Sequence, residues 1–383
     1  MSSHYKRPHG SLISYMSNQV KTRGGINLAQ GIPGFQPPRA LLEELSQTAF
    51  DPVHQYAPGI GNVNLLNSLL EKYQPFGNFH TDNLLITNGA TEAVSLLYTY
   101  FNQHLTRPYS VLSFEPAYES YRMLPGIFHD KFISFAYQPD GSIHFDQLAT
   151  LCRQENVRIV FLNTPGNPYG RIWQDEEVEK LVQICRDQGI YLVLDTVYQD
   201  LYFSAEPFHP LHHFFEGMFY VNSFSKIFSV TGWRIGYLIA PAGHMREIRS
   251  VHDYTGLCAP SVLQEALARY INRHNWGKAY IEDLRQKLAR HFNLLKEGLE
   301  HLGFYIPGIQ GGFFVWARLP EGYSDGFQVA MDLYEKQKVA VIPGEHFSER
   351  HRNYIRLNIA REKQEVEQGL QRLTAYFNPK KTL

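Results

Sequence analysis

The chain has 383 residues, of which 44% are hydrophobic and 19% are charged, and its formal net charge is -1. This length suggests two domains, or one large domain with a satellite, and the composition argues against global disorder. The near-neutral charge gives no reason to expect nucleic acid or an anionic membrane surface as a partner.

Neither a membrane span nor a secretory signal is expected. No apolar run approaches the roughly 18 residues that cross a bilayer, and the basic segment at residues 1–10 lacks the apolar centre of a signal peptide. Three cysteines, Cys152, Cys185 and Cys258, lie far apart and form no CxxC pair. They are too few for a disulfide framework, so we expect a cytoplasmic protein.

The first predicted elements are helices at residues 11–23, ended by Gly24-Gly25, and 39–50, opened by Pro37-Pro38. From residue 84 to 240, β-rich runs alternate with helical patterns. The runs are residues 84–87, 110–114, 158–162, 190–194, 219–221 and 237–240, and the helices are 90–102, 145–154 and 175–188. The alternation predicts an α/β domain with a mainly parallel sheet buried on both faces.

After Pro260 the pattern changes to helices at residues 261–274, 276–301 and 363–377, and short strands at 304–306, 313–319, 339–341 and 354–358. This predicts a smaller α+β domain with an antiparallel sheet. We expect a large domain over residues 31–265 and a small domain over 266–383, joined by an N-terminal arm, 1–30.

The carboxyl ends of the predicted strands carry polar, small or aromatic residues. They are Asn88-Gly89-Ala90-Thr91, Glu115-Pro116-Ala117-Tyr118, Asn163-Thr164-Pro165-Gly166-Asn167-Pro168, Asp195-Thr196-Val197-Tyr198 and Ser223-Phe224-Ser225-Lys226. Ligands of open α/β sheets bind at this edge. Five such ends on one edge therefore predict a binding site.

A phosphate is one candidate ligand. Asn88-Gly89-Ala90-Thr91 leads into a helix whose free N–H groups bind anions, although it could also be a plain capping turn. Ser223, Ser225 and Arg234 could complete the site with hydroxyls and a guanidinium. GxxxxGK[ST] and a strand–helix GxGxxG are absent, which argues against a nucleoside triphosphatase and a dinucleotide fold.

Asp195 ends an apolar run and could bind a metal, bind a cationic nitrogen, or cap the next segment. No second carboxylate or histidine is spaced to complete a metal site with it, and the nearest histidines, His209, His212 and His213, are expected at the surface. We therefore predict no metal.

Lys226 lies in a stretch that reads as interior, so it could be either a nucleophile or a snorkelling lysine with a hydrated amine. The same edge also carries a phosphate cradle, the carboxylate of Asp195 and the ring of Tyr118. Pyridoxal 5'-phosphate needs all four groups, and we predict it as the cofactor.

The sequence resembles the fold-type I pyridoxal-phosphate aminotransferases of class I/II, in order along nearly the whole chain. The segments that carry the resemblance to the methionine, aromatic and kynurenine aminotransferases are "NLAQGIPGF", "QYAPGIG", "TNGATEA", "NTPGNPYG" and "TGWRIGY". The resemblance implies a mixed, mostly parallel seven-stranded sheet in the large domain, a small domain built from both termini, and a homodimer.

The resemblance also implies catalytic roles. Lys226 is similar to the Schiff-base lysine that also shuttles a proton between substrate and cofactor, and Asp195 to the acid on the pyridine nitrogen. Tyr198 and Asn167 are expected at the ring 3'-oxygen, and Tyr118 on the ring face.

For the phosphate, the resemblance implies the amides of Ala90 and Thr91, with Ser223 and Arg234. It implies that Tyr56 reaches the phosphate of the neighbouring subunit.

Substrate roles follow in the same way. Arg356 is similar to the arginine that pairs with the substrate α-carboxylate, helped by Asn167 and the backbone at Gly31. We see no second arginine for a distal carboxylate. The expected pocket lining, Ile13, Tyr15, Leu257, Cys258 and Phe313, favours methionine, aromatic or other uncharged side chains.

Three positions depart from the family pattern. Ile32 and Gly34 replace a common Phe and Asp near the substrate entrance, and Thr196 replaces a common acid of secondary importance.

Three functions fit these residues. The first is an aminotransferase that moves the amino group of an uncharged amino acid to a 2-oxo acid. The second is a C–S β-lyase on the same scaffold, of cystathionine or cysteine-conjugate type. The third is a non-catalytic, cofactor-binding regulatory domain, which the near-neutral charge and the short segment before the core disfavour. The subgroup motifs favour the first.

Overall fold

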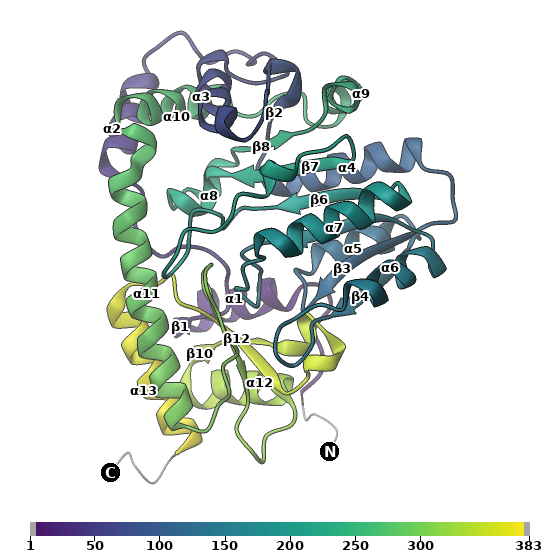
Figure 1. Ribbon diagram of the computed structural model, residues 1–383. Helices are drawn as coiled ribbons and strands as arrows, with labels where there is room; N and C mark the ends of the chain where they lie inside the picture. The colour runs from purple at the N-terminus through teal and green to yellow at the C-terminus, as the bar shows by residue number, and fades with distance from the viewer. Residues whose placement is uncertain (1–4, 379–383) are drawn as a thin grey trace.

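A seven-stranded sheet lies at the centre of the computed structural model, which describes residues 5–378 (Figure 1). In spatial order its strands are β2 (Leu84–Thr87), β8 (Gly236–Ile239), β7 (Met218–Ser223), β6 (Tyr191–Asp195), β5 (Val157–Asn163), β3 (Ser110–Glu115) and β4 (Lys131–Ala136). Strand β8 runs opposite to the other six strands, which are parallel to one another. The predicted α/β class with a mixed, mostly parallel sheet is confirmed.

Helices bury both faces of this sheet. Val193 packs in a core with α4 (Ala90–His104) and α9 (Ala242–Thr255), whereas its neighbours Leu192 and Leu194 pack in a second core with α6 (Phe145–Gln154) and α7 (Asp175–Gln188). Side chains of a strand alternate between faces, so a strand buried on both sides reads as a continuous apolar run. This pattern explains why the central strands could be predicted.

The C-terminal part forms a separate three-stranded antiparallel sheet, shown in yellow-green in Figure 1. Its strands are β11 (Ile342–Pro343), β12 (Tyr354–Asn358) and β9 (Phe314–Arg318), and its helices are α11 (Lys278–His301), α12 (Gly326–Gln337) and α13 (Lys363–Phe377). The N-terminal strand β1 (Ile26–Asn27) pairs in parallel with β10 (Val339–Ala340). Chain segments more than 300 residues apart thus form one unit.

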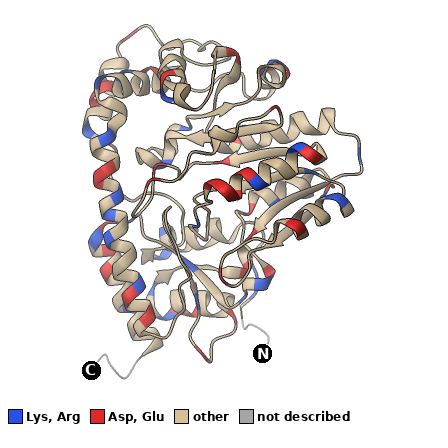
Figure 2. Cartoon of the chain, in the orientation of Figure 1, with Lys and Arg blue, Asp and Glu red and all other residues tan. Residues whose placement is uncertain are grey.

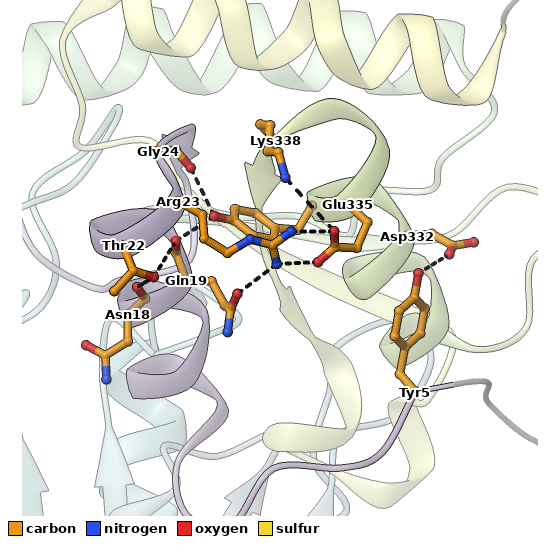
Figure 3. A network of polar contacts seen from close by, with 10 residues as sticks. Tyr5, Asn18, Gln19, Thr22, Arg23, Gly24, Asp332, Glu335 and Lys338 are labelled. Carbon is orange, nitrogen blue, oxygen red and sulfur yellow. Dashed lines mark hydrogen bonds and ion pairs between the residues drawn. The ribbon is translucent and has the colours of Figure 1, made fainter.

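Polar contacts hold helix α1 (Leu12–Arg23) against α12 (Figure 3). The Arg23 guanidinium donates to both carboxylate oxygens of Glu335, at 2.5 and 2.6 Å, and the Tyr5 hydroxyl donates to Asp332 at 2.8 Å. These contacts support our proposal that residues 1–30 belong with 266–383. The proposed boundary at residue 265 falls within α10 (Ser261–Arg273).

Several elements differ from the prediction. Helices α3 (Val63–Tyr73), α5 (Ser120–Ile127), α9 and α12 and the edge strand β4 were not predicted. Helices α2 (Arg39–Thr48) and α10 lie where the sequence pattern predicts a helix. Helix α8 (Phe224–Ile227) lies in a segment that follows a predicted strand. The strand predicted at residues 304–306 is wrong: Tyr305 forms only an isolated bridge with Arg318. The strand predicted at 339–341 is divided, because β10 pairs with β1 and β11 with β12.

Charges of both signs are mixed along α11, whereas acids gather at the start of α7 (Figure 2). Asp175, Glu176 and Glu177 occupy the first turn of α7, where the helix dipole favours negative charge. No helix within residues 5–378 is long and apolar enough to cross a membrane.

Candidate active site

A cavity of about 470 Å³ opens at the carboxyl edge of the central sheet. Residues from all five predicted strand ends line it, together with residues from α1 and β12. The sequence-predicted residues in its wall are Gly31, Ala90, Thr91, Tyr118, Asn167, Asp195, Tyr198, Ser223, Lys226, Arg234 and Arg356. The fold therefore brings together side chains that lie more than 300 positions apart in the sequence.

Lys226 lies on the short helix α8, directly after β7. Its amine donates a hydrogen bond to the carbonyl oxygen of Gly31 at 2.8 Å. Burial lowers the pKa of this amine to about 8, against the opposing effect of the Asp195 carboxylate. A lysine with such a pKa is partly neutral near physiological pH, which is the condition for nucleophilic attack on a carbonyl group.

Asp195 is the last residue of β6, and its side chain is buried. Burial raises the pKa of this carboxyl group above its ordinary value. The Tyr121 hydroxyl donates to Oδ2 at 2.6 Å and the Val197 amide donates to Oδ1 at 3.2 Å, and both bonds favour the ionised form. Sequence reasoning missed Tyr121, although it lies only three residues after Tyr118, in the segment that follows a predicted strand end.

Two glycines permit a close approach between Arg234 and the start of α4. At Gly89, with φ of +78°, an added Cβ would lie 2.5 Å from an Arg234 nitrogen, and a Cβ at Gly236 would lie 2.6 Å from the Gly89 backbone. Arg234 itself has φ of 59°, a conformation that non-glycine residues rarely adopt. The guanidinium is thus held beside the free N–H groups of the first turn of α4.

The donors around this helix start fit a phosphate group. Arg234 donates to two backbone oxygens, those of Thr231 and Asn88, each at 3.1 Å, and within residues 5–378 it forms no ion pair. Ser223 and Ser225 also line the cavity, and the Ser223 hydroxyl accepts from the Ser225 amide at 3.0 Å. A guanidinium without an acidic partner, next to hydroxyls and a helix N-terminus, is suited to a dianion.

Arg356 lies in the middle of β12 and is fully buried. Its guanidinium carbon lies 4.1 Å from the ring centroid of Phe314 and 4.8 Å from that of Phe347. One terminal nitrogen donates to the Asn167 side-chain oxygen at 2.9 Å and the other to the Ala29 carbonyl oxygen, whereas Nε has no hydrogen-bond partner. Burial lowers the pKa of Arg356 to about 10. A buried cation without an acidic partner is suited to a ligand carboxylate.

Of the remaining predicted residues, Tyr198 lies in the cavity wall and Tyr56 does not. The Tyr198 ring centroid lies 5.3 Å from that of Phe313 and 6.0 Å from the Lys226 amine, inside the cavity wall. Tyr56 is 82% exposed and does not line the cavity of its own chain. Its predicted role in the neighbouring subunit stays a prediction.

The predicted pocket lining is only partly correct for the single chain. Ile13 lines the cavity, but Tyr15, Leu257, Cys258 and Phe313 do not. Leu257 is 44% exposed, and Phe313 is buried behind Tyr198. These four positions depended on apolar character, which does not distinguish a pocket from the core or the surface.

Two of the three departures from the family pattern lie outside the cavity. Ile32 lines the cavity. The amide of Gly34 donates a hydrogen bond to the carbonyl oxygen of Ala360, and the buried hydroxyl of Thr196 donates one to the carbonyl oxygen of Val221.

The predicted surface position of the histidine cluster needs correction. Only His212 is exposed, and the half-buried ring of His209 stacks on Phe76 with centroids 3.9 Å apart. His213 contacts Asp175. All three lie outside the cavity described above.

A lysine of lowered pKa, a buried carboxylate and a set of donors suited to a phosphate, all at one sheet edge, fit a pyridoxal-phosphate enzyme of fold type I. Residues 23–373 match the family model for class I and II aminotransferases. The chain belongs to this family, and it is a pyridoxal-phosphate-dependent aminotransferase that acts on amino acids and oxo acids.

Named relatives agree on the activity and differ in the amino acid. An aromatic aminotransferase of Arabidopsis thaliana is 30% identical over 348 residues, covering 87% of this chain and 84% of the relative. A probable aspartate aminotransferase of Methanocaldococcus jannaschii is 27% identical over 378 residues, covering 97% and 98%. The crystal structure of YbdL from Escherichia coli, described with a methionine aminotransferase function, has 28% identity and a TM-score of 0.86, covering 97% and 99%.

Tyr121→Phe is expected to weaken pyridoxal phosphate binding about tenfold or more, because a hydrogen bond to a charged group stabilises it by about 1.5–3 kcal/mol. The change should also shift the pH titration of the absorbance of the bound cofactor, since Asp195 becomes a weaker partner for the ring nitrogen. Tyr98→Phe is the matched control, because Tyr98 donates to Asp130 at 2.6 Å away from the cavity. Identical cofactor affinity and titration in both variants would remove Tyr121 from this role.

Proposed function

We propose that this aminotransferase moves the amino group of an uncharged L-amino acid, of the methionine, aromatic or kynurenine type, to a 2-oxo acid. One observation supports the uncharged side chain. Among the described residues, the cavity is lined by three cations, Lys226, Arg234 and Arg356, and each has a role toward the cofactor or the α-carboxylate. Among the described residues, no cation lines the part beside α1 and α5, where the apolar side chains of Ile13, Met123, Leu124 and Ile127 lie together with the polar ones of Ser11, Ser14, Glu119 and Ser120.

The cofactor, when bound, supplies an electron sink that stabilises negative charge at the substrate α-carbon. Lys226 would hold the cofactor covalently through its aldehyde and would move the proton at the substrate α-carbon. Asp195 would keep the ring nitrogen protonated. Tyr198 and Asn167 would donate to the 3'-oxygen, and Tyr118 would pack on the ring.

Anion binding divides between the two ends of the cavity. The amides of Ala90 and Thr91, with Ser223 and Arg234, bind the phosphate. At the other end, Arg356 binds the substrate α-carboxylate. Its contacts with Asn167 and the two phenylalanine rings support this role, because they orient the guanidinium before a ligand arrives. Asn167 and the backbone at Gly31 assist there.

We further propose a homodimer in which the partner subunit's Tyr56 reaches the phosphate. Exposed apolar side chains in the same part of the sequence support it, since Phe50 is 90%, Tyr56 82% and Val63 59% exposed in the single chain. We also propose a cytoplasmic location, which the three free cysteines support.

The function can be tested by adding single amino acids to the purified, cofactor-loaded protein. We expect the visible absorption band of the lysine-bound cofactor to be replaced by that of the aminated cofactor with methionine, phenylalanine or kynurenine. A 2-oxo acid should then restore the original band. Pyruvate release from a cysteine conjugate without amination of the cofactor would favour the β-lyase. Cofactor binding without turnover of any amino acid would favour a regulatory domain.

A further inference from the structure

Glu119 lies in the cavity wall, and the proposed function assigns it no contact with the cofactor or with the substrate α-carboxylate. It precedes α5 and lines the cavity with Ser11 and Ile13. Among the described residues that line the cavity, it and Asp195 are the two acids. Asp195 is assigned to the ring nitrogen, so Glu119 remains for the substrate side chain.

Two contacts fix the orientation of this carboxylate. The Ser11 hydroxyl donates to Oε1 at 2.8 Å, and the His346 ring nitrogen Nε2 lies 3.0 Å from Oε2. The Glu119 side chain is 20% exposed, and that of His346 is 7% exposed. Burial raises the pKa of Glu119, but His346, Ser11 and the positive charge of Arg356 outweigh this effect and bring the pKa below its ordinary value. Glu119 is therefore ionised at neutral pH.

Within residues 5–378, no cation that faces the cavity forms an ion pair with this acid, although the positive charge of Arg356 acts on it. Besides Ser11, the close polar partner of Glu119 within residues 5–378 is the His346 ring, while Arg234 and Arg356 form no ion pair there and remain available to ligand anions. A substrate carboxylate placed near Glu119 would meet a like charge, which is unfavourable in a partly buried site. A side-chain N–H group would instead find an ionised acceptor.

We propose that Glu119 determines side-chain specificity, by excluding amino acids with a side-chain carboxylate and favouring neutral side chains that carry an N–H donor, such as an amide, an indole or an aromatic amine. This inference rests on the proposed function, because it takes the α-carboxylate to lie on Arg356. Ser11 and His346 are positioning residues for the carboxylate.

Glutamate and glutamine are suitable probes, because they differ little in shape and by one charge. For Glu119→Gln, the ratio of kcat/KM for glutamate to that for glutamine in the first half-reaction is expected to rise about tenfold or more. Most of the change should be in KM. The matched control is Glu247→Gln, which removes the acid of another histidine–glutamate pair, with His104, outside the cavity. It should leave the ratio unchanged, and an equal ratio in both variants would overturn the proposal.

A binding measurement separates this proposal from the proposed function. Calorimetric titration of the cofactor-loaded wild type should give tighter binding of valerate than of glutarate, and Glu119→Gln should reduce this difference. If no amino acid aminates the cofactor, the proposed function fails. The relative affinity of the protein for valerate and glutarate still tests the role of Glu119 in that case. If Glu119→Gln does not fold, the wild-type preference decides: glutarate binding as tightly as valerate, or more tightly, would overturn the proposal.

Discussion

Lys226→Ala is expected to abolish covalent attachment of pyridoxal phosphate and to lower the rate of the first half-reaction by about 10²-fold to 10⁴-fold. The variant removes both the nucleophile and the group that moves the proton at the substrate α-carbon. The phosphate cradle does not depend on this side chain, so the variant should still bind the cofactor noncovalently. Absorbance of the bound cofactor and stopped-flow kinetics with methionine would measure the two losses.

The pH dependence of attachment provides a second test of Lys226. Because burial lowers the pKa of its amine to about 8, from an ordinary value of 10.5, the neutral nucleophile becomes the major form above pH 8. The rate at which apoprotein forms the covalent bond should therefore rise with pH, with a midpoint near pH 8, and level off at higher pH. A midpoint near 10.5 would contradict the buried environment.

A matched lysine gives the control. Lys72 is half-buried, lies 3.3 Å from Asp200 and is outside the cavity. Lys72→Ala should retain the absorption band and the half-reaction rate. Loss of both in Lys72→Ala, or retention of both in Lys226→Ala, would show that Lys226 is not the attachment site.

Arg356→Ala is expected to lower kcat/KM for the amino acid by about 10²-fold to 10⁴-fold. A charge-assisted hydrogen bond stabilises a complex by about 1.5–3 kcal/mol, the guanidinium can form two to a carboxylate, and each 1.4 kcal/mol is tenfold. The change should lie mainly in substrate binding, since this residue is assigned to the α-carboxylate. Cofactor absorbance before and after addition of substrate measures the two properties separately.

Arg356→Lys distinguishes recognition from charge alone. Lysine keeps the positive charge but lacks the planar fork that Asn167 and the Phe314 and Phe347 rings now orient. We expect an intermediate loss of kcat/KM with the cofactor fully bound. If Arg356→Ala bound cofactor normally and left both half-reactions unchanged, the substrate would be held elsewhere.

The central sheet and the cofactor end of the cavity could be predicted because their signals are local. Strands such as β6 are continuous apolar runs, and Asp195 marks the end of one of them. Lys226 and Arg234 are cations within a buried segment, and Gly89 precedes a clear helical pattern. Each of these features is visible within about ten residues.

The missing parts depend on contacts between distant segments. The edge strand β4 was missed because most of it is partly exposed and its apolar run is interrupted. Tyr121 matters only because α5 packs so that its hydroxyl reaches Asp195, 74 positions away. Glu119 has a place in the cavity only because Ser11 and His346, from both ends of the chain, hold it there. Sequence periodicity carries no information about such pairings.

Chemical trapping of the lysine tests the central claim most directly. The cofactor-loaded wild-type protein would be treated with borohydride, digested, and its peptides sequenced by mass spectrometry. The account predicts that the reduced cofactor is attached to Lys226, and that prior addition of methionine prevents the attachment. Attachment to another lysine, or no attachment in a protein that retains the cofactor absorption band, would contradict it.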